Sequence, residues 1–138
     1  MQIKENSELL CKFYDELCSK FEFALKYGLK KAVVGYFLSG KLLVPNLQVW
    51  TLQKGKTNFI THNAFTKKNP DKLTEELLKI FEELHIFCKK HGDDWQSFTF
   101  VMHKDIEKFL YDARYNYEPV KIVDREFLLG WKGQFFYN

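Results

Sequence analysis

Hydrophobic and polar positions along this chain follow two different periods. Across residues 7–25, apolar side chains recur every three or four positions, which is the spacing of one face of an α-helix. They are Leu10, Phe13, Tyr14, Leu17, Phe21, Ala24 and Leu25. Gly28 follows shortly afterwards and suits a helix stop. The pattern predicts one amphipathic helix over residues 7–25.

The next segments are rich in β-branched and aromatic residues, which favour strands. Residues 32–38 and 42–53 form two such runs, and the turn between them contains Gly40. Pro45 marks an edge, a bulge or a late strand start, because proline cannot donate to a sheet ladder. A second turn at residues 54–56 leads to a short run, 57–61. A three-stranded meander is predicted.

Helical spacing returns after Asn69, which is placed as an N-cap, with Pro70 at the first helical position. The apolar stripe consists of Leu73, Leu77, Ile80, Phe81, Leu84, Phe87 and Cys88. Two lysines and then His91 and Gly92 close the helix. This is the clearest predicted element of the chain.

Residues 95–102 and 108–117 alternate between apolar and polar and predict a second antiparallel hairpin. The following segment, 121–129, is compatible with a short helix or with extended structure. At 138 residues, the chain is expected to form a single domain, residues 1–138. The predicted fold is α+β, an antiparallel sheet of five or six strands with two main helices packed on one face.

The composition predicts a folded, cytoplasmic protein. Hydrophobic residues make up 46% and aromatic residues 17%, far more than a disordered chain carries. No signal-peptide pattern and no run of about eighteen apolar residues occurs, so a membrane is not expected as a partner. The odd number of cysteines, at Cys11, Cys18 and Cys88, argues against a disulfide framework.

The charge distribution suggests one alternative function. The net charge is +3, but the segment 26–68 contains eight lysines and no acid, so the rest of the chain is net acidic. Lysines beside the rings of Tyr36, Phe37, Trp50 and Phe59 could bind single-stranded nucleic acid. Only two of the 21 basic residues are arginine, which disfavours specific readout. A nucleic-acid-binding module using the 26–68 region is therefore kept as the alternative.

Catalytic and metal-binding patterns are weak. Cys88 lies three residues from both His85 and His91, and His62 or His103 could add ligands from elsewhere. Positions i, i+3 and i+6 turn progressively around a helix, so these side chains do not easily aim at one ion. The glycines form no phosphate-binding loop. We expect no catalytic residues, no metal and no cofactor, and we interpret Cys88 as a core thiol.

From about residue 59 onward, the order of motifs is distinctive. Phe59-Ile60-Thr61-His62 precedes a polar loop and the helix from Pro70, and Asp93-Asp94-Trp95-Gln96-Ser97-Phe98-Thr99-Phe100 follows that helix. Lys108-Phe109, the run 112–117 and the closing Arg125-Glu126-Phe127-Leu128-Leu129-Gly130-Trp131 complete the series. This order resembles the YezG-like immunity family of bacterial polymorphic toxin and contact-dependent inhibition systems. The chain departs from that family in its basic middle and in Asp112-Ala113-Arg114-Tyr115, where the family has an acidic run.

The resemblance implies a cytoplasmic, non-catalytic inhibitor that binds a cognate toxin domain. A nuclease toxin presents basic surface, so its inhibitor is expected to offer carboxylates. The candidate toxin-binding residues are Asp93, Asp94, Trp95, Asp105, Glu107, Asp112, Tyr115 and Tyr117. The alternative acidic set, Glu75, Glu76, Glu82 and Glu83, is interpreted as the solvated face of the second helix.

Overall fold

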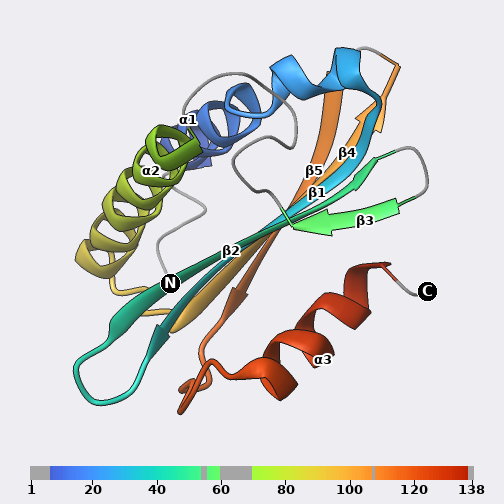
Figure 1. Cartoon of the computed structure of the whole chain (residues 1–138). Coiled ribbons are helices and arrows are strands. Elements are labelled where there is room, and N and C mark those ends of the chain that lie inside the picture. The colour runs from blue at the N-terminus through green and yellow to red at the C-terminus, as the bar shows by residue number, and fades with distance from the viewer. Residues whose placement is uncertain (1–6, 54–55, 60–69, 107, 137–138) are drawn as a thin grey trace.

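A computed structural model describes residues 7–53, 56–59, 70–106 and 108–136 (Figure 1). Its elements are α1 (Ser7–Ser19), the 3₁₀ helix η2 (Glu22–Tyr27), β1 (Leu29–Ser39), β2 (Val44–Gln53), β3 (Lys56–Phe59), α2 (Pro70–Lys90), β4 (Ser97–Asp105), β5 (Lys108–Asn116) and α3 (Arg125–Phe136). The α+β class and the antiparallel sheet are confirmed. The proposed cap Asn69, the turn residues Lys54 and Gly55, and Glu107 lie outside the described residues.

The strands form one sheet in the order β3-β2-β1-β4-β5, and every neighbouring pair is antiparallel. β1 lies at the centre, and its residues 32–38 are all buried. A strand that is buried at every position has both faces covered, whereas a half-covered strand alternates. The sheet therefore has a hydrophobic layer on each side.

α1 and α2 cover one face of the sheet, as Figure 1 shows. The core on this side is aromatic: Tyr36 stacks on Phe81 of α2 with ring centroids 5.3 Å apart, and Phe81 packs on Phe98 at 5.5 Å. Trp95, which follows α2, is fully buried in the same layer. The alternating apolar positions of β4 and β5 thus face the two amphipathic helices.

The first helix is shorter than the sequence pattern predicts. α1 ends at Ser19, and η2 follows with a tighter turn that ends at Gly28, whose φ is +88°. The tighter winding rotates Phe21 and Ala24 into the core, where both are fully buried, just before β1 begins. The prediction of one continuous helix over residues 7–25 is therefore wrong, although the expected stop at Gly28 is correct.

The predicted placement of two helices on one face omits a third helix, α3, which covers part of the opposite face (Figure 1). Phe127, Trp131 and Phe135 recur every four residues on α3 and pack on Phe37, Val33 and Val101. Trp131 lies directly over Gly35, where a Cβ atom would come within 2.6 Å of the indole ring. The segment 121–129, left open between helix and strand, thus contains the start of a helix that runs on to Phe136.

Candidate functional site

Three loops meet at the lower end of the sheet in Figure 1. They are the β1–β2 turn (40–43), the segment after α2 (91–96) and the segment after β5 (117–124). The amide of Gly40 donates to the Val120 carbonyl at 3.2 Å, and the amide of Gln96 donates to the Asn116 carbonyl at 2.8 Å. These bonds join segments that are far apart in the sequence into one surface, which we call the loop end.

The loop end exposes large aliphatic and aromatic side chains. Leu42 is 88% exposed, Ile122 63%, Val44 56% and Tyr117 50%. Leu43 adopts φ +49°, a left-handed conformation that is uncommon for a residue other than glycine, asparagine or aspartate. Backbone strain of this kind tends to occur at functional positions. Large apolar side chains exposed together are typical of interaction sites.

The same three loops also carry carboxylates. The three loops contain four acids, Asp93, Asp94, Glu118 and Asp124, against Lys41 and Lys121. Asp94 and Glu118 are exposed. Asp124 caps α3, because its Oδ1 accepts the amide hydrogen of Phe127 at 2.8 Å. A pocket of about 420 Å³ lies beside this cap, and Glu118, Lys121 and Glu126 are among its lining residues.

Asp93 is the least expected acid of the loop end. Gly92 has φ +79°, and the amide of Asp93 donates to the Cys88 carbonyl at 2.9 Å, which closes α2 in a Schellman-type turn. This turn places the Asp93 side chain in the interior, where it is 2% exposed. Within the described part of the chain, the Tyr117 hydroxyl is the one hydrogen-bond donor to this carboxylate. A buried carboxylate with so few donors is costly and is seldom kept without a role.

Besides burial, the charge of Asp93 raises the pKa of the tyrosine hydroxyls near it. Burial raises the pKa of Tyr115, and Tyr14, Cys88 and Asp93 raise it further. Burial also raises the pKa of Tyr117, and the neighbouring Asp93 carboxylate adds to that rise. The hydroxyls of Tyr14 and Tyr115 are hydrogen-bonded to each other. Asp93 therefore lies under half-exposed Tyr117, at the edge of a phenol cluster.

The structure brings only some of the predicted toxin-binding residues together. Asp93, Asp94 and Tyr117 belong to the loop end, while Trp95 is fully buried and Tyr115 packs on Phe98 at 4.7 Å. Asp105 ends β4 at the opposite end of the sheet, and Glu107 lies outside the described residues. Asp112 lies within β5 and accepts from Arg114 Nε at 2.8 Å. Asp93 and Asp94 therefore cannot share one compact contact surface with Asp105.

The cysteine and histidine side chains near the end of α2 have separate partners. Cys88 is fully buried, and burial raises the pKa of its thiol while the nearby Trp95 N–H opposes that rise. His85 Nε2 lies 3.6 Å from Asp94, and His91 Nδ1 lies 2.9 Å from the Phe87 carbonyl. Among the described residues, no group of three His, Cys, Asp or Glu side chains could hold a metal ion, and His62 is not among those residues.

The lysines of the 26–68 region are divided between the two ends of β1. Lys31 lies near its start, where Nζ is hydrogen-bonded to the Phe135 carbonyl, and Lys41 lies in the turn beyond Ser39. Eight residues of strand separate Lys31 from Ser39, which corresponds to roughly 26 Å. These two lysines therefore do not form one patch, and Lys54, Lys67 and Lys68 lie outside the described residues.

Sequence reasoning missed the exposed aliphatic residues of the loop end. The predicted strand over residues 42–53 includes Leu42 and Leu43, which lie in the turn, whereas Val44 does begin β2. Three apolar residues in succession at a hairpin turn, where polar residues are usual, were the available signal. The contact between the β1–β2 turn and Val120 has no sequence signal, because it depends on the register of three strands, β1, β4 and β5.

Comparisons with known proteins add no relative: neither a scan against protein-family models nor a search of curated proteins finds a match. Among the described helices, none is both long enough and apolar enough to cross a membrane.

Proposed function

We propose that this chain is a cytoplasmic immunity protein that neutralises a bacterial toxin domain by binding it, without catalysis, through the loop end. The observation that carries the proposal is that exposed Leu42 and Ile122 lie in two loops joined by the Gly40–Val120 hydrogen bond, while exposed Asp94 and Glu118 lie in segments joined by the Gln96–Asn116 hydrogen bond. Exposed apolar side chains supply a core for an interface, and a rim of charges steers the encounter and selects the partner. The resemblance of the motifs from residue 59 to residue 131 to the YezG-like immunity family supports the class of partner.

The chemistry of the loop end favours a partner with basic side chains. Asp94, Glu118 and Glu126 are all exposed, and each can pair with a lysine or arginine of the partner. A nuclease toxin needs such basic residues to hold its own substrate. Covering them would block the substrate and neutralise the toxin at the same time.

Asp93 provides a second reason to expect a cationic partner. Its buried carboxylate has the hydroxyl of half-exposed Tyr117 as its one donor among the described residues. A lysine or arginine of the partner would add the donors that this carboxylate can still accept. The cost of burying Asp93 would then be offset in the complex, so free energy stored in the free chain contributes to affinity.

The test is affinity capture from the native host with matched variants of the full chain. A tagged wild type should retain one stoichiometric protein at low and at high salt, and the Leu42→Ser/Ile122→Ser variant should lose it. The control is Ile106→Ser, because Ile106 is 84% exposed but lies in the β4–β5 turn at the opposite end of the sheet. Ile106→Ser should retain the partner as well as the wild type does.

The captured protein must then prove to be a toxin that this chain neutralises. Expression of its toxic domain should arrest bacterial growth, and co-expression of the wild-type chain, but not of the double variant, should restore it. If the double variant and Ile106→Ser lost the partner equally, the loop end would not be the binding surface. Capture of salt-labile nucleic acid in place of a protein would favour a nucleic-acid-binding module instead.

A further inference from the structure

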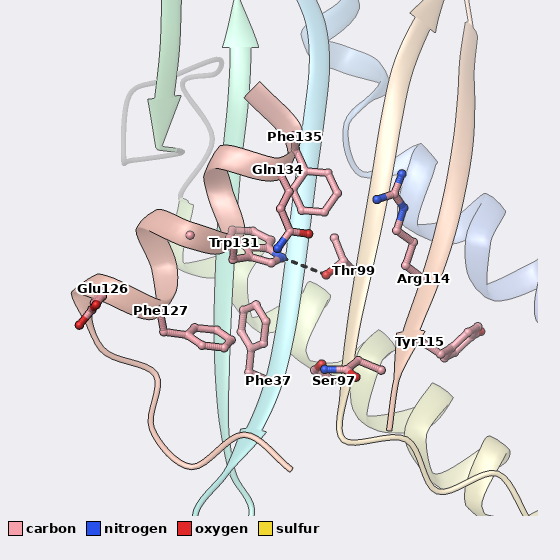
Figure 2. A pocket seen from close by; sticks show the side chains of 12 residues that line it. Phe37, Ser97, Thr99, Arg114, Tyr115, Glu126, Phe127, Trp131, Gln134 and Phe135 are labelled. Carbon is pink, nitrogen blue, oxygen red and sulfur yellow. Dashed lines mark hydrogen bonds between the residues drawn. The ribbon is translucent and has the colours of Figure 1, made fainter. Parts of the chain in front are cut away.

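A second pocket, separate in its chemistry from the loop end, opens between α3 and the strands β4 and β5 (Figure 2). Its volume is about 410 Å³, which is within the usual range for a site that takes a small molecule. Phe37, Phe127 and Trp131 form an aromatic wall, and Ser97 and Thr99 of β4 lie beside them in Figure 2. Arg114 and Asn116 of β5 complete the polar side.

The polar residues of this pocket form two cross-strand pairs. Ser97 lies opposite Asn116, and Thr99 lies opposite Arg114, in the antiparallel register of β4 and β5. Side chains opposite each other are about 5 Å apart, and residues two apart on a strand are about 7 Å apart. The four side chains therefore lie on the same face of the sheet, close enough for one small group to contact several of them.

Three of these side chains keep hydrogen-bond donors available. Thr99 Oγ1 accepts the Trp131 indole hydrogen at 3.0 Å, which leaves its own hydroxyl hydrogen to donate. Asn116 Oδ1 accepts the Glu118 amide hydrogen at 3.2 Å, which leaves the Asn116 amide group. Arg114 donates from Nε to Asp112 at 2.8 Å, and its guanidinium lies over the Phe135 ring at 5.1 Å, which leaves the hydrogens of its terminal amino groups for a ligand at this edge of the pocket. Donors of this kind favour an acceptor, and an arginine favours an anion.

Two cations, Lys31 and Arg114, lie on this face of the sheet, and one carboxylate, Asp112, is ion-paired with Arg114. Lys31 and His103 are a cross-strand pair on the same face of the sheet, beyond Arg114. Burial lowers the pKa of Lys31 and the charge of Arg114 lowers it further, while burial and then Lys31 lower the pKa of His103. The lowered pKa favours neutral His103, so Lys31 and Arg114 are the cations on this face. Glu126 also lines the pocket, but its side chain points away from the aromatic wall in Figure 2.

The aromatic wall is fixed before any ligand arrives. Trp131 is held by its hydrogen bond to Thr99 and by edge-to-face packing on Phe37 at 5.3 Å, and it rests on the bare backbone of Gly35. Phe127 packs edge-to-face on Phe37 at 5.1 Å. A wall that does not need to rearrange loses little entropy on binding.

We propose that this pocket binds a small organic anion with a flat apolar body. The body lies against Phe127 and Trp131, and the anionic group, a carboxylate or a phosphate, accepts hydrogen bonds from Arg114, Asn116 and Thr99. The site does not depend on the toxin-binding function, since its residues lie on the sheet face and use the second hydrophobic layer.

The experiment is an NMR titration of the full chain that follows the three tryptophan indole N–H resonances. The probes are 2-naphthoate, 2-naphthyl phosphate and the uncharged 2-naphthamide, which share one flat body. Both anions should shift the Trp131 resonance saturably, and the buried Trp95 resonance should stay in place. The amide should bind at least about tenfold more weakly, the loss expected for one charge-assisted contact. Tighter binding of the phosphate would identify a phosphate ligand, and equal or tighter binding of the carboxylate would identify a carboxylate.

The chain offers a matched control, because it contains two arginines, Arg114 and Arg125. Arg114→Gln should weaken anion binding about tenfold, while Arg125→Gln, outside the pocket lining, should leave it unchanged. The proposal is overturned if neither anion shifts Trp131 at millimolar concentration, if the amide binds equally well, or if the two variants behave alike. If Arg114→Gln does not fold, the proposal is still tested by comparing the affinities of the anions and of the amide for the wild-type chain.

Discussion

Gly35→Ala tests the close approach of α3 to the centre of the sheet. The added Cβ would lie 2.6 Å from Trp131 Cζ2 and 2.7 Å from two ring atoms of Phe37, where carbon atoms normally keep 3.5–4.0 Å. Neither ring can retreat easily, because Trp131 is hydrogen-bonded to Thr99 and Phe37 is 2% exposed. Overpacking of this kind costs about 1–3 kcal/mol.

The opposing effect is the intrinsic gain of replacing glycine within a strand, about 0.5–1 kcal/mol. The net loss of unfolding free energy should therefore be about 0.5–2 kcal/mol. With a urea dependence of about 2 kcal/mol per molar, the unfolding midpoint should fall by about 0.25–1 M. Urea titration monitored by far-UV circular dichroism measures this shift directly.

Gly130→Ala is the matched control on α3 itself. No heavy atom lies within 4 Å of the position its Cβ would take, so only helix propensity acts, and stability should rise by up to about 1 kcal/mol. In a Trp131→Phe background, Gly35→Ala should cost less than in the wild type, because the nearest clashing atom is gone. An unchanged or raised midpoint for Gly35→Ala alone would refute the proposed packing of α3.

Four further results are expected. Thr99→Val should lower stability by about 1–3 kcal/mol in urea titration, because it leaves the buried Trp131 N–H without its acceptor, whereas Thr99→Ser should not. A thiol titration with Ellman's reagent should show one fast cysteine, exposed Cys11, and Cys11→Ser should remove the fast phase. Burial and the nearby carboxylates raise the pKa of Cys18 from about 9 to about 12, so the unfolded chain loses this proton first and stability should fall between pH 9 and pH 12. Asp93→Asn should raise the urea midpoint of the free chain yet weaken toxin binding, and a fall in both would show that Asp93 only supports the fold.

Elements whose pattern is local could be predicted from the sequence. α2 begins at Pro70 and ends at Lys90, just before His91 and Gly92, where the sequence places it. The alternation of Phe98, Phe100 and Met102 correctly assigns one face of β4 to the helices. These features depend on spacing and capping within a few residues, which the sequence records directly.

The second hydrophobic layer was harder to predict, although β1 contains a signal for it. The uninterrupted run from Ala32 to Leu38 is typical of a strand covered on both faces, which requires an element over the second face. That element is α3, whose apolar spacing is interrupted by Gly130 and Lys132. The need for a glycine at position 35 becomes clear only from the structure, where Trp131 packs directly against it.

The candidate site depends on long-range placement and was only partly predictable. Asp94 and Tyr117 reach one end of the sheet, with Asp93 buried there, because α2 ends beside the start of β4, and β4 pairs with β5. Asp105 has similar local surroundings in the sequence, but nine residues of β4 carry it to the far end of the sheet. Burial of Trp95 and Asp93 likewise follows from the turn geometry at Gly92 and not from residue type.

The most direct test of the proposed function is the dissociation constant of the captured toxin domain, measured by calorimetry at two salt concentrations. Asp94→Lys/Glu118→Lys at the loop end is compared with Asp105→Lys at the opposite end. The account predicts that the loop-end variant binds at least tenfold more weakly, most clearly at low salt, and that Asp105→Lys binds like the wild type. Equal affinities for all three chains, or a loss confined to Asp105→Lys, would contradict it.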